Sequence, residues 1–183
     1  MAFKTFPHHM LSTSAHAFFQ ANVWQMPVNS PLGSLTLVAS DKGLCGVWFE
    51  DQAHKPDLRH LPWGPSQHWL RLAKTQLTEY FAGKRSSFDL PLDLANGSAF
   101  QQSVWRSLLQ IPYGRYSTYG ELAQHLGQAQ AARAVGMAVG RNPLSIIVPC
   151  HRVVAGDGSL GGYSLGLKMK KQLLALEGVS EAE

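Results

Sequence analysis

Ser145-Ile-Ile-Val-Pro-Cys-His-Arg-Val-Val154 is the stretch of sequence from which both the fold and the chemistry of this chain can be worked out. The apolar run over residues 146–148 predicts a buried strand. The proline that follows has no N–H to donate and would end the pairing of that strand. A thiol, an imidazole and a guanidinium, at residues 150–152, would then lie together at the strand's end.

These three side chains are typical of nucleophilic chemistry. A thiol becomes a strong nucleophile as thiolate, and cationic or hydrogen-bonding neighbours lower its pKa. His151 could take the proton of Cys150, and Arg152 would add positive potential. Adjacent residues of an extended chain point to opposite sides, so a direct Cys–His bond would need a bend or a bridging water. An inert core thiol is the alternative, and the polar neighbours argue against it.

A base of this kind usually needs a third group to orient it. Apolar residues at helical spacing predict a helix over 168–176 that ends at Gly178. Glu177 lies in its last turn, where the helix dipole disfavours an anion. Its carboxylate should therefore either point to solvent or pair with a cation such as His151.

The glycine-rich segment 156–166 connects the thiol to that helix. It lacks the Gly-Lys-Ser/Thr of a nucleotide-binding P-loop, which excludes that site. Its five glycines instead favour a pliable loop whose backbone can approach a flat ligand. An ordinary connecting loop is the alternative.

Upstream, two short helices predict a helix-turn-helix. Thr118 and Glu121 have capping-box spacing and should begin the first helix, which Gly127 ends. The second covers Ala129–Gly140, is rich in Ala and Gly, and carries Arg133 at its middle. A short helix, a glycine turn and a second helix are typical of DNA-binding motifs. Close helix–helix packing without a ligand is the alternative.

The first part of the chain predicts a small sheet with a helix. Residues 35–39 and 44–49 should form a hairpin around the turn at 41–43. Proline-rich residues 51–66 should be a loop, and the apolar spacing from Trp69 to Phe81 predicts a helix that Gly83 ends. Residues 88–94 are expected to form another strand.

We therefore expect an α/β protein with three segments. Residues 1–22 show no pattern and should be a flexible arm. Residues 23–96 should form an N-terminal α/β lobe, and the Asn-Gly-Ser break that follows separates it from a C-terminal lobe over 97–183. Pattern alone indicates only a hairpin and a helix in the first lobe.

Charge is distributed unevenly along the 183 residues. The net charge is +4, but eight basic residues and two acidic ones lie between Phe100 and Lys171, whereas residues 1–98 are nearly neutral. This pattern favours a polyanionic partner for the second lobe, with chance clustering as the alternative. The two cysteines cannot build a disulfide framework, and neither a membrane-length apolar run nor a signal peptide is visible. We expect a cytoplasmic protein.

Taken together, these motifs resemble the O6-alkylguanine-DNA alkyltransferases (methylated-DNA–protein-cysteine methyltransferases) of the bacterial type. The resemblance extends from Pro31 to Gly178 and is most specific over 142–154. Supporting matches are Pro31-Leu-Gly33, Phe100-Gln101, Val104-Trp105, Ile111-Pro-Tyr-Gly114, Tyr119-Gly-Glu-Leu-Ala123, Ala131-Ala-Arg-Ala-Val-Gly136, Gly161-Gly-Tyr-Ser164, Leu173-Leu174 and Glu177-Gly178.

The resemblance implies a fold and an activity. The first lobe would be a ribonuclease-H-like antiparallel sheet with a helix, and the second a winged helix-turn-helix that carries the reactive cysteine. The activity implied is DNA repair by direct reversal, in which the O6-alkyl group of guanine, or the O4-alkyl group of thymine, moves irreversibly to Cys150. The protein would act once, as a monomer on double-stranded DNA, without a cofactor or metal.

Roles for the catalytic residues follow from the same resemblance. Cys150 would attack the alkyl carbon, Glu177 would orient His151, and His151 would polarise a water against the thiol. Asn142 would support the turn and hydrogen-bond near the site. Tyr119 would help to rotate the nucleotide out of the duplex, and its hydroxyl would serve N3 of guanine.

Substrate and DNA contacts are also implied. The backbone near Cys150 and Val153 would accept from the guanine amine, the backbone of Ser164 would meet O6, and Tyr163 would belong to the same pocket. The helix over 129–140 would enter the minor groove, with Arg133 inserted into the base stack. The further DNA-binding residues of that helix would be Ala131, Ala132 and Gly136.

The sequence departs from the family pattern at three positions and at a metal site. Thr118 replaces the common Ser, Tyr116 stands where a small or polar residue is usual, and Leu165 replaces a Gly of some relatives, which would narrow the pocket. Some relatives bind structural zinc in the first lobe. Here Cys45 is the lobe's lone cysteine, and His8, His9 and His16 lie in the predicted arm, so no zinc site is expected.

Three other functions compete with alkyl transfer. A thiol hydrolase could use Cys150, His151 and Glu177, although its base would usually come from a distant chain position. A sensor of alkylated bases would bind without repair, but such relatives replace the reactive cysteine. A transcription regulator would not need the Pro-Cys-His-Arg segment. An alkyl group trapped on Cys150 would separate repair from all three.

Overall fold

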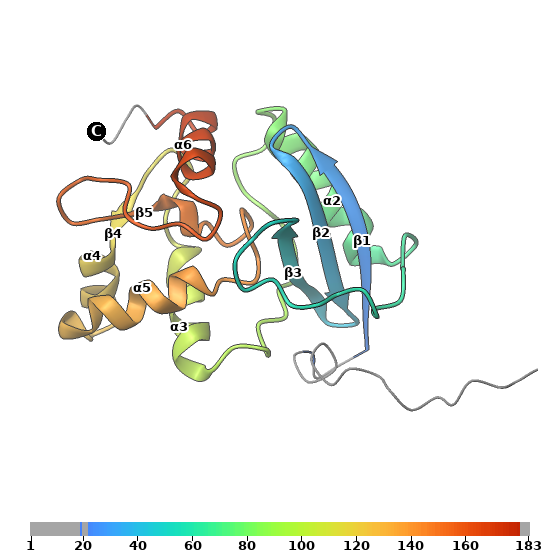
Figure 1. The fold of residues 1–183 in the computed structure, drawn as a ribbon, viewed down its shortest axis with the longest axis horizontal. Coiled ribbons are helices and arrows are strands. Elements are labelled where there is room, and N and C mark those ends of the chain that lie inside the picture. Colours follow the sequence, from blue (N-terminus) through green and yellow to red (C-terminus); the bar gives the residue numbers. More distant parts are fainter. Residues whose placement is uncertain (1–18, 20–21, 180–183) are drawn as a thin grey trace, which may run out of the picture.

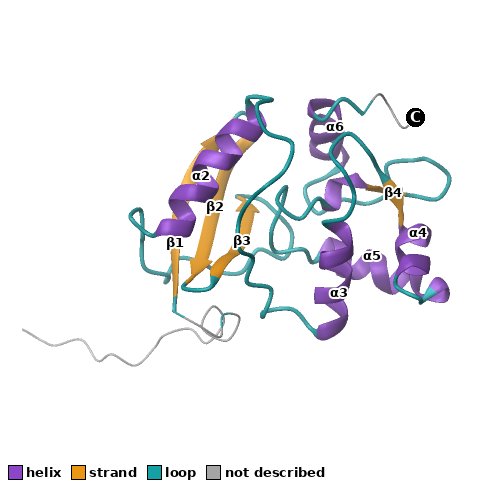
Figure 2. Ribbon diagram, turned by 180° about the vertical axis from the view of Figure 1, so that it is seen from behind, coloured by secondary structure: helices purple, strands orange, loops and turns teal. Residues whose placement is uncertain are grey.

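The computed structural model describes residue 19 and residues 22–179. A three-stranded sheet with one long helix forms the first half, and the second half consists mainly of short helices (Figures 1 and 2). One core of buried apolar residues runs through both halves. The predicted flexible arm therefore lies almost entirely outside the described residues. Phe19 is described, and its ring packs edge-on against Trp48.

The sheet is an antiparallel meander of β1 (Val23–Ser30), β2 (Gly33–Ser40) and β3 (Gly43–Phe49). The predicted hairpin is confirmed as β2 and β3, with Ser40 opposite Gly43. The strand β1 was not predicted beyond the expectation that structure begins near its first residue. Its pairing with β2 is continuous despite Pro27 because β1 lies at the edge of the sheet.

Each face of the sheet is covered by a different segment. Helix α2 (His68–Phe81) packs on one face, as the spacing of its apolar residues predicts, and ends before Gly83, whose φ is +68°. Residues 51–66 form a loop, as expected, and two of its leucines pack with residues of the opposite face. The buried residues of that second cluster are Phe19, Val23, Val38, Cys45, Trp48, Leu58 and Leu61.

The prediction of a strand over residues 88–94 is wrong. The segment makes an isolated bridge between Leu92 and Leu44, supported by a hydrogen bond from the Leu44 N–H to the Pro91 carbonyl of 2.9 Å. Pro91 has no N–H with which to continue a ladder, and the segment crosses β3 near its first residues.

The second half begins with two capped helices. Helix α3 (Ala99–Leu108) and helix α4 (Tyr119–His125) both have complete capping boxes, with Ser98 and Thr118 as the capping residues. The predicted second helix of the motif starts with a 3₁₀ turn, η1 (Ala129–Ala131), and continues as α5 (Ala132–Gly140). Both α3 and α4 pack on α5, so the helix-turn-helix rests on a third helix.

The prediction of a strand over residues 146–148 is also wrong, because these residues belong to no strand. They are buried, as expected. A short parallel bridge between Leu144 and Val47 extends the sheet at β3. The chain then turns sharply, and Ile146 adopts a φ of +73°, which is unusual for a β-branched residue. A single 3₁₀ turn, η2 (Cys150–Arg152), follows and leads into β5 (Val153–Val154). The apolar run thus fills the junction between the two halves instead of pairing along its length.

The C-terminal helix agrees with its prediction. Helix α6 (Leu167–Leu176) ends at Glu177, and Gly178, with φ of +74°, reverses the chain.

Candidate active site around Cys150

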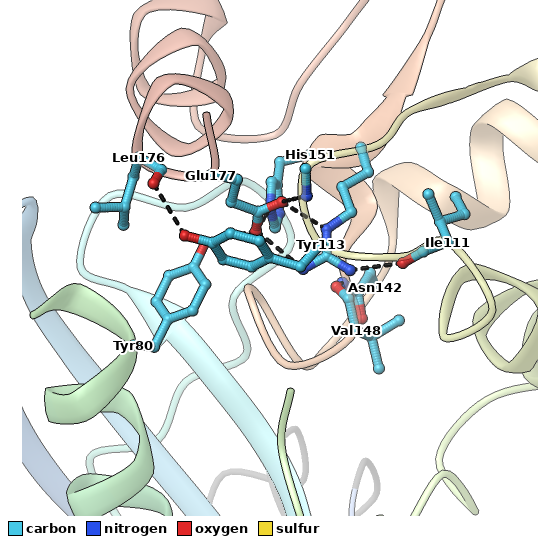
Figure 3. Close-up of polar contacts among 10 residues, drawn as sticks. Tyr80, Ile111, Tyr113, Asn142, Val148, His151, Leu176 and Glu177 are labelled. Atoms are coloured by element: carbon cyan, nitrogen blue, oxygen red, sulfur yellow. Dashed lines mark hydrogen bonds and ion pairs between the residues drawn. The ribbon is translucent and has the colours of Figure 1, made fainter. Parts of the chain in front are cut away.

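A fully enclosed carboxylate lies at the centre of the site. Glu177 is at the C-terminal end of α6 and is 3% exposed. Its Oε1 accepts from Tyr80 Oη at 2.7 Å and from Arg152 Nη2 at 3.0 Å, and lies 2.7 Å from His151 Nε2. Its Oε2 accepts from Arg152 Nε at 2.8 Å and from the Gly114 N–H at 3.5 Å. Figure 3 shows these donors converging on the carboxylate from three segments of the chain.

The protonation states of this cluster follow from the contacts. Burial by itself would raise the pKa of Glu177, but the hydrogen bonds from His151 and Arg152 outweigh it and hold the pKa at about 2. Burial lowers the pKa of His151 despite the nearby carboxylate. Because an ionised carboxylate only accepts hydrogen bonds, we assign the proton of the neutral imidazole to Nε2. The buried Nδ1 of His151 has no protein hydrogen-bond partner.

Cys150 lies next to this cluster at the start of η2 and is 3% exposed. The side-chain amide of Asn142 donates to its Sγ at 3.1 Å and to the Val148 carbonyl at 2.8 Å. The same side chain accepts from the Leu144 N–H at 3.0 Å, so Asn142 both shapes the turn and contacts the thiol. Burial raises the pKa of Cys150, and the Asn142 bond and the neighbouring Tyr163 hydroxyl oppose that increase. The resting side chain is therefore a thiol.

A parallel pair of two-residue strands places the helix-turn-helix next to the segment that carries Cys150. The strand β4 (Ser117–Thr118) pairs with β5 in parallel, with Ser117 opposite Val153. Helix α4 begins at the next residue, so Tyr119 lies near Cys150, and burial together with that thiol raises the pKa of its hydroxyl. The Tyr119 ring packs between Gly136 of α5 and Gly161 of the glycine-rich loop, and its hydroxyl donates to the Gly162 carbonyl at 3.3 Å.

The glycine-rich loop is held in place by a buried cation that the sequence did not indicate. Lys170 of α6 is 0% exposed, and its Nζ donates to the carbonyls of Val153, Leu160 and Gly162. The loop also contacts the first half, because the Ala53 N–H donates to the Ser164 carbonyl at 3.2 Å. Burial lowers the pKa of Lys170 to about 8.

The predicted pocket residues come from β5 and from this loop. Val153 follows η2 directly, and Ser164 is half-buried. The hydroxyl of Tyr163 is buried beside Cys150 without a protein partner in hydrogen-bonding geometry. A polar atom in that position is expected to meet water or a ligand.

The predicted DNA-binding residues occupy the outer side of α5. Arg133 and Met137 are exposed, whereas Ala131, Ala132 and Gly136 are half-buried. No acidic residue lies in η1 or α5. Tyr116, the departure noted before β4, is 51% exposed. This surface therefore carries one cation, Arg133, and it lies on the same helix-turn-helix as Tyr119.

Two assignments from sequence differ from the structure. Arg152 was expected to act on the thiol, but its guanidinium bonds to Glu177 and to the Ile111 carbonyl at 2.6 Å. Tyr80 was interpreted only as an apolar member of the α2 stripe, and its hydroxyl contacts the carboxylate. Only the amphipathic nature of Tyr could have indicated this, because a buried Tyr usually bonds through its hydroxyl.

The described part of the chain adds two negative findings. No cluster of three His, Cys, Asp or Glu side chains there is arranged to bind a metal ion. No helix of residues 22–179 has the length and apolar character to cross a lipid bilayer. His8, His9 and His16 lie outside the described residues.

Two family models match this chain. The model described as 6-O-methylguanine DNA methyltransferase, ribonuclease-like domain, matches residues 26–94. The model described as 6-O-methylguanine DNA methyltransferase, DNA binding domain, matches residues 99–179.

Curated relatives match over most of their length. A Mycobacterium tuberculosis protein named methylated-DNA–protein-cysteine methyltransferase is 46% identical over 150 residues, which cover 82% of this chain and 89% of the relative. A Methanosarcina acetivorans protein of the same name is 46% identical over 149 residues, covering 81% and 94%.

Solved structures are similar as well. The crystal structure of the M. tuberculosis O6-methylguanine methyltransferase matches with a TM-score of 0.78 at 43% identity, covering 88% of this chain and 96% of that one. The crystal structure titled as M. tuberculosis OGT in complex with DNA matches with a TM-score of 0.75 at 45% identity, covering 82% and 90%.

Replacing Glu177 by Gln should destabilise the protein and change how its stability depends on pH. At pH 7 the free energy of unfolding should fall by about 3–5 kcal/mol, because the Arg152 charge loses its buried partner. In the unmodified protein, Glu177 has its pKa lowered from about 4.3 in the unfolded chain to about 2. Its contribution is therefore complete above pH 4.3 and is lost as the pH falls through 2.

Urea unfolding between pH 7 and pH 2.5 measures this effect. Protonation of His151 in the unfolded chain destabilises both proteins as the pH falls below about 6.5, since burial lowers its pKa in the fold. The decline below pH 4.3 should be smaller in the Gln variant. Glu79→Gln, at a partly exposed pair with Arg85, should cost less than about 1 kcal/mol. Equal costs for the two substitutions would contradict the assigned role of Glu177.

Proposed function

This chain belongs to the 6-O-methylguanine DNA methyltransferase family, whose activity is DNA repair by transfer of an alkyl group to a cysteine of the protein, and we propose that Cys150 is that cysteine. The α/β fold expected from the resemblance is confirmed, with a ribonuclease-like first half and a helical DNA-binding second half. The single observation that carries the proposal is the contact of the Cys150 thiol with Asn142, beside a buried His151–Glu177 pair.

The other cysteine has the opposite environment. Cys45 lies in β3, and its Sγ faces the Val38 carbonyl at 3.5 Å. Burial raises its pKa to about 12, and the negative charge of Asp93 adds to that increase. Backbone N–H groups of Ser40 and Cys45 oppose that increase only in part. Cys150 instead accepts a hydrogen bond from the side-chain amide of Asn142 and is followed directly by an imidazole that can take its proton.

The thiol needs a route for its proton because burial keeps it protonated at rest. We infer that a water accepts from Sγ–H and donates to the unprotonated Nδ1 of His151, which is buried and has no protein partner. Glu177 would stabilise the imidazolium that forms, through the 2.7 Å contact with Nε2. The imidazole then acts as a general base without direct contact to sulfur.

The chemical step is an in-line displacement. The thiolate forms a bond to the alkyl carbon as the bond from that carbon to O6 breaks, and the electron pair leaves with guanine. The Tyr119 hydroxyl, near Cys150, would donate a proton to N3 of the leaving guanine anion. The product is a thioether that no described residue could hydrolyse, so each molecule would react once.

The extruded base would lie between η2 and the glycine-rich loop. Carbonyl oxygens at Cys150 and Val153 each have a second lone pair for the guanine amine, besides the donors they already accept. The backbone of Ser164 would meet O6, and the buried hydroxyl of Tyr163 would contribute a polar contact beside the thiol. O4-alkylthymine would present its alkyl group in the same way.

The DNA would be bound by the outer side of α5. Arg133 would enter the base stack, and the half-buried Ala131, Ala132 and Gly136 would let the helix backbone approach the minor groove. A damaged pair costs less to open, which favours extrusion of the lesion. All of these groups come from one chain, which supports a monomer. A free reactive thiol supports a reducing compartment such as the cytoplasm.

Reaction with excess duplex containing one O6-methylguanine should add one methylene mass per protein, located on Cys150 by peptide mapping. Cys150→Ser should gain no mass while still binding the duplex, and Cys45→Ser should react like the unmodified protein. Mass gained on Cys45 would refute the assignment of the acceptor. Binding of the duplex without any mass gain would instead indicate a lesion sensor.

Arg133→Ala should slow repair of duplex DNA about 10–100-fold, because extrusion costs a few kcal/mol that the inserted side chain offsets. Its reaction with free O6-methylguanine, which requires no extrusion, should keep its rate. Arg71→Ala, an exposed arginine of α2, serves as the matched control and should leave both rates unchanged. Rapid-quench single-turnover kinetics measures both substrates. Equal slowing on duplex and free base would contradict the role in extrusion.

A further inference from the structure

Tyr80 brings the first half of the molecule into the reaction centre. It lies in α2, 97 positions before Glu177, and its hydroxyl donates to Oε1 of that carboxylate at 2.7 Å. His151 Nε2 contacts the same oxygen at 2.7 Å. The proposed transfer gives Tyr80 no role, yet its hydroxyl shares the oxygen that would stabilise the imidazolium (Figure 3).

The position of the hydroxyl is fixed by the packing of its ring. Tyr80 is 0% exposed. Its ring packs edge-on against Phe81 at 5.4 Å and Tyr113 at 6.2 Å between centroids, and tilted against Phe88 at 5.5 Å. These contacts come from α2, from the loop after α3 and from the segment that crosses β3. A ring held on three sides delivers its hydroxyl to one point, which is the carboxylate.

We propose that Tyr80 is a positioning residue for alkyl transfer, whose hydroxyl holds Oε1 of Glu177 in place and limits how strongly that oxygen supports the His151 imidazole. The part of this role that concerns reaction rate rests on the proposed function, because it requires His151 to act as the base. The N-terminal lobe would then tune the base of the C-terminal lobe through one hydrogen bond.

The direction of the effect follows from how donors share an acceptor. Each additional donor withdraws negative charge from Oε1 and weakens its remaining bonds. Without the Tyr80 hydroxyl, the carboxylate would hold the imidazolium more strongly, and the pKa of His151 would rise. The other groups that face the pair remain in place, and they are Arg152 and Cys150 of η2, Lys170 of α6, Tyr113 after α3 and Tyr163 of the glycine-rich loop.

Tyr80→Phe tests this role because it removes the hydroxyl and keeps the ring. Titration of the ¹⁵N-labelled imidazole by NMR, in the whole protein without DNA, should show the His151 pKa raised by about 0.5–1, the equivalent of one hydrogen bond of ordinary net strength. The acid limb of the single-turnover rate with O6-methylguanine duplex should move to higher pH by the same amount. A purely structural contact would change stability or rate at every pH without moving either quantity.

Tyr113→Phe is the matched control. Its hydroxyl donates to the Leu176 carbonyl at 3.0 Å, so its loss disturbs the neighbouring residue without removing a donor from the carboxylate. It should leave the His151 pKa unchanged. An unchanged pKa in Tyr80→Phe, or equal shifts in both variants, would overturn the proposal. A raised pKa with an unmoved rate profile would support the tuning of His151 and refute its use as the base in the proposed function.

Discussion

The burial of one ionised carboxylate is the constraint on which the rest of this structure depends. Glu177 lies where the dipole of α6 disfavours it, and burial alone would neutralise it. Five hydrogen-bond contacts from Tyr80, Gly114, His151 and Arg152 keep it charged. Because these residues belong to α2, to the loop after α3 and to η2, satisfying the carboxylate also fixes the two halves of the molecule against each other.

The same constraint accounts for a resting site that is ordered yet unreactive. Arg152 is occupied by the carboxylate, so the thiol is polarised mainly by Asn142, and burial keeps it protonated. In the proposed reaction, a bridging water would complete the path of the proton from the buried thiol to the neutral imidazole. If each molecule reacts once, as we propose, protection of the thiol before it meets its substrate matters as much as speed. The surface of α5 that we propose to bind DNA belongs to the same half of the molecule as this core.

Sequence patterns predicted the turns and helix ends that depend on neighbouring residues. They missed the features that depend on packing between distant segments. The hairpin, α2, the capping residue Thr118 and the end of α6 follow from turn chemistry and spacing, and all were predicted. The capping box at Ser98 was not predicted, because that residue was interpreted only as part of a break between the lobes. The run Ile146–Val148 has the composition of a strand, but it fills the junction between two lobes and turns through a positive φ. The neighbours of Glu177 were predicted only in part, since Tyr80 and the orientation of Arg152 depend on how distant segments meet.

The tautomer of His151 in the unmodified protein tests this account most directly. ¹⁵N NMR of the imidazole at neutral pH distinguishes the two neutral tautomers and the cation. A charged Glu177 that orders a neutral imidazole predicts a proton on Nε2 and none on Nδ1. A proton on Nδ1, or on both nitrogens, would contradict the claim, because His151 could then not accept the proton of the thiol through Nδ1.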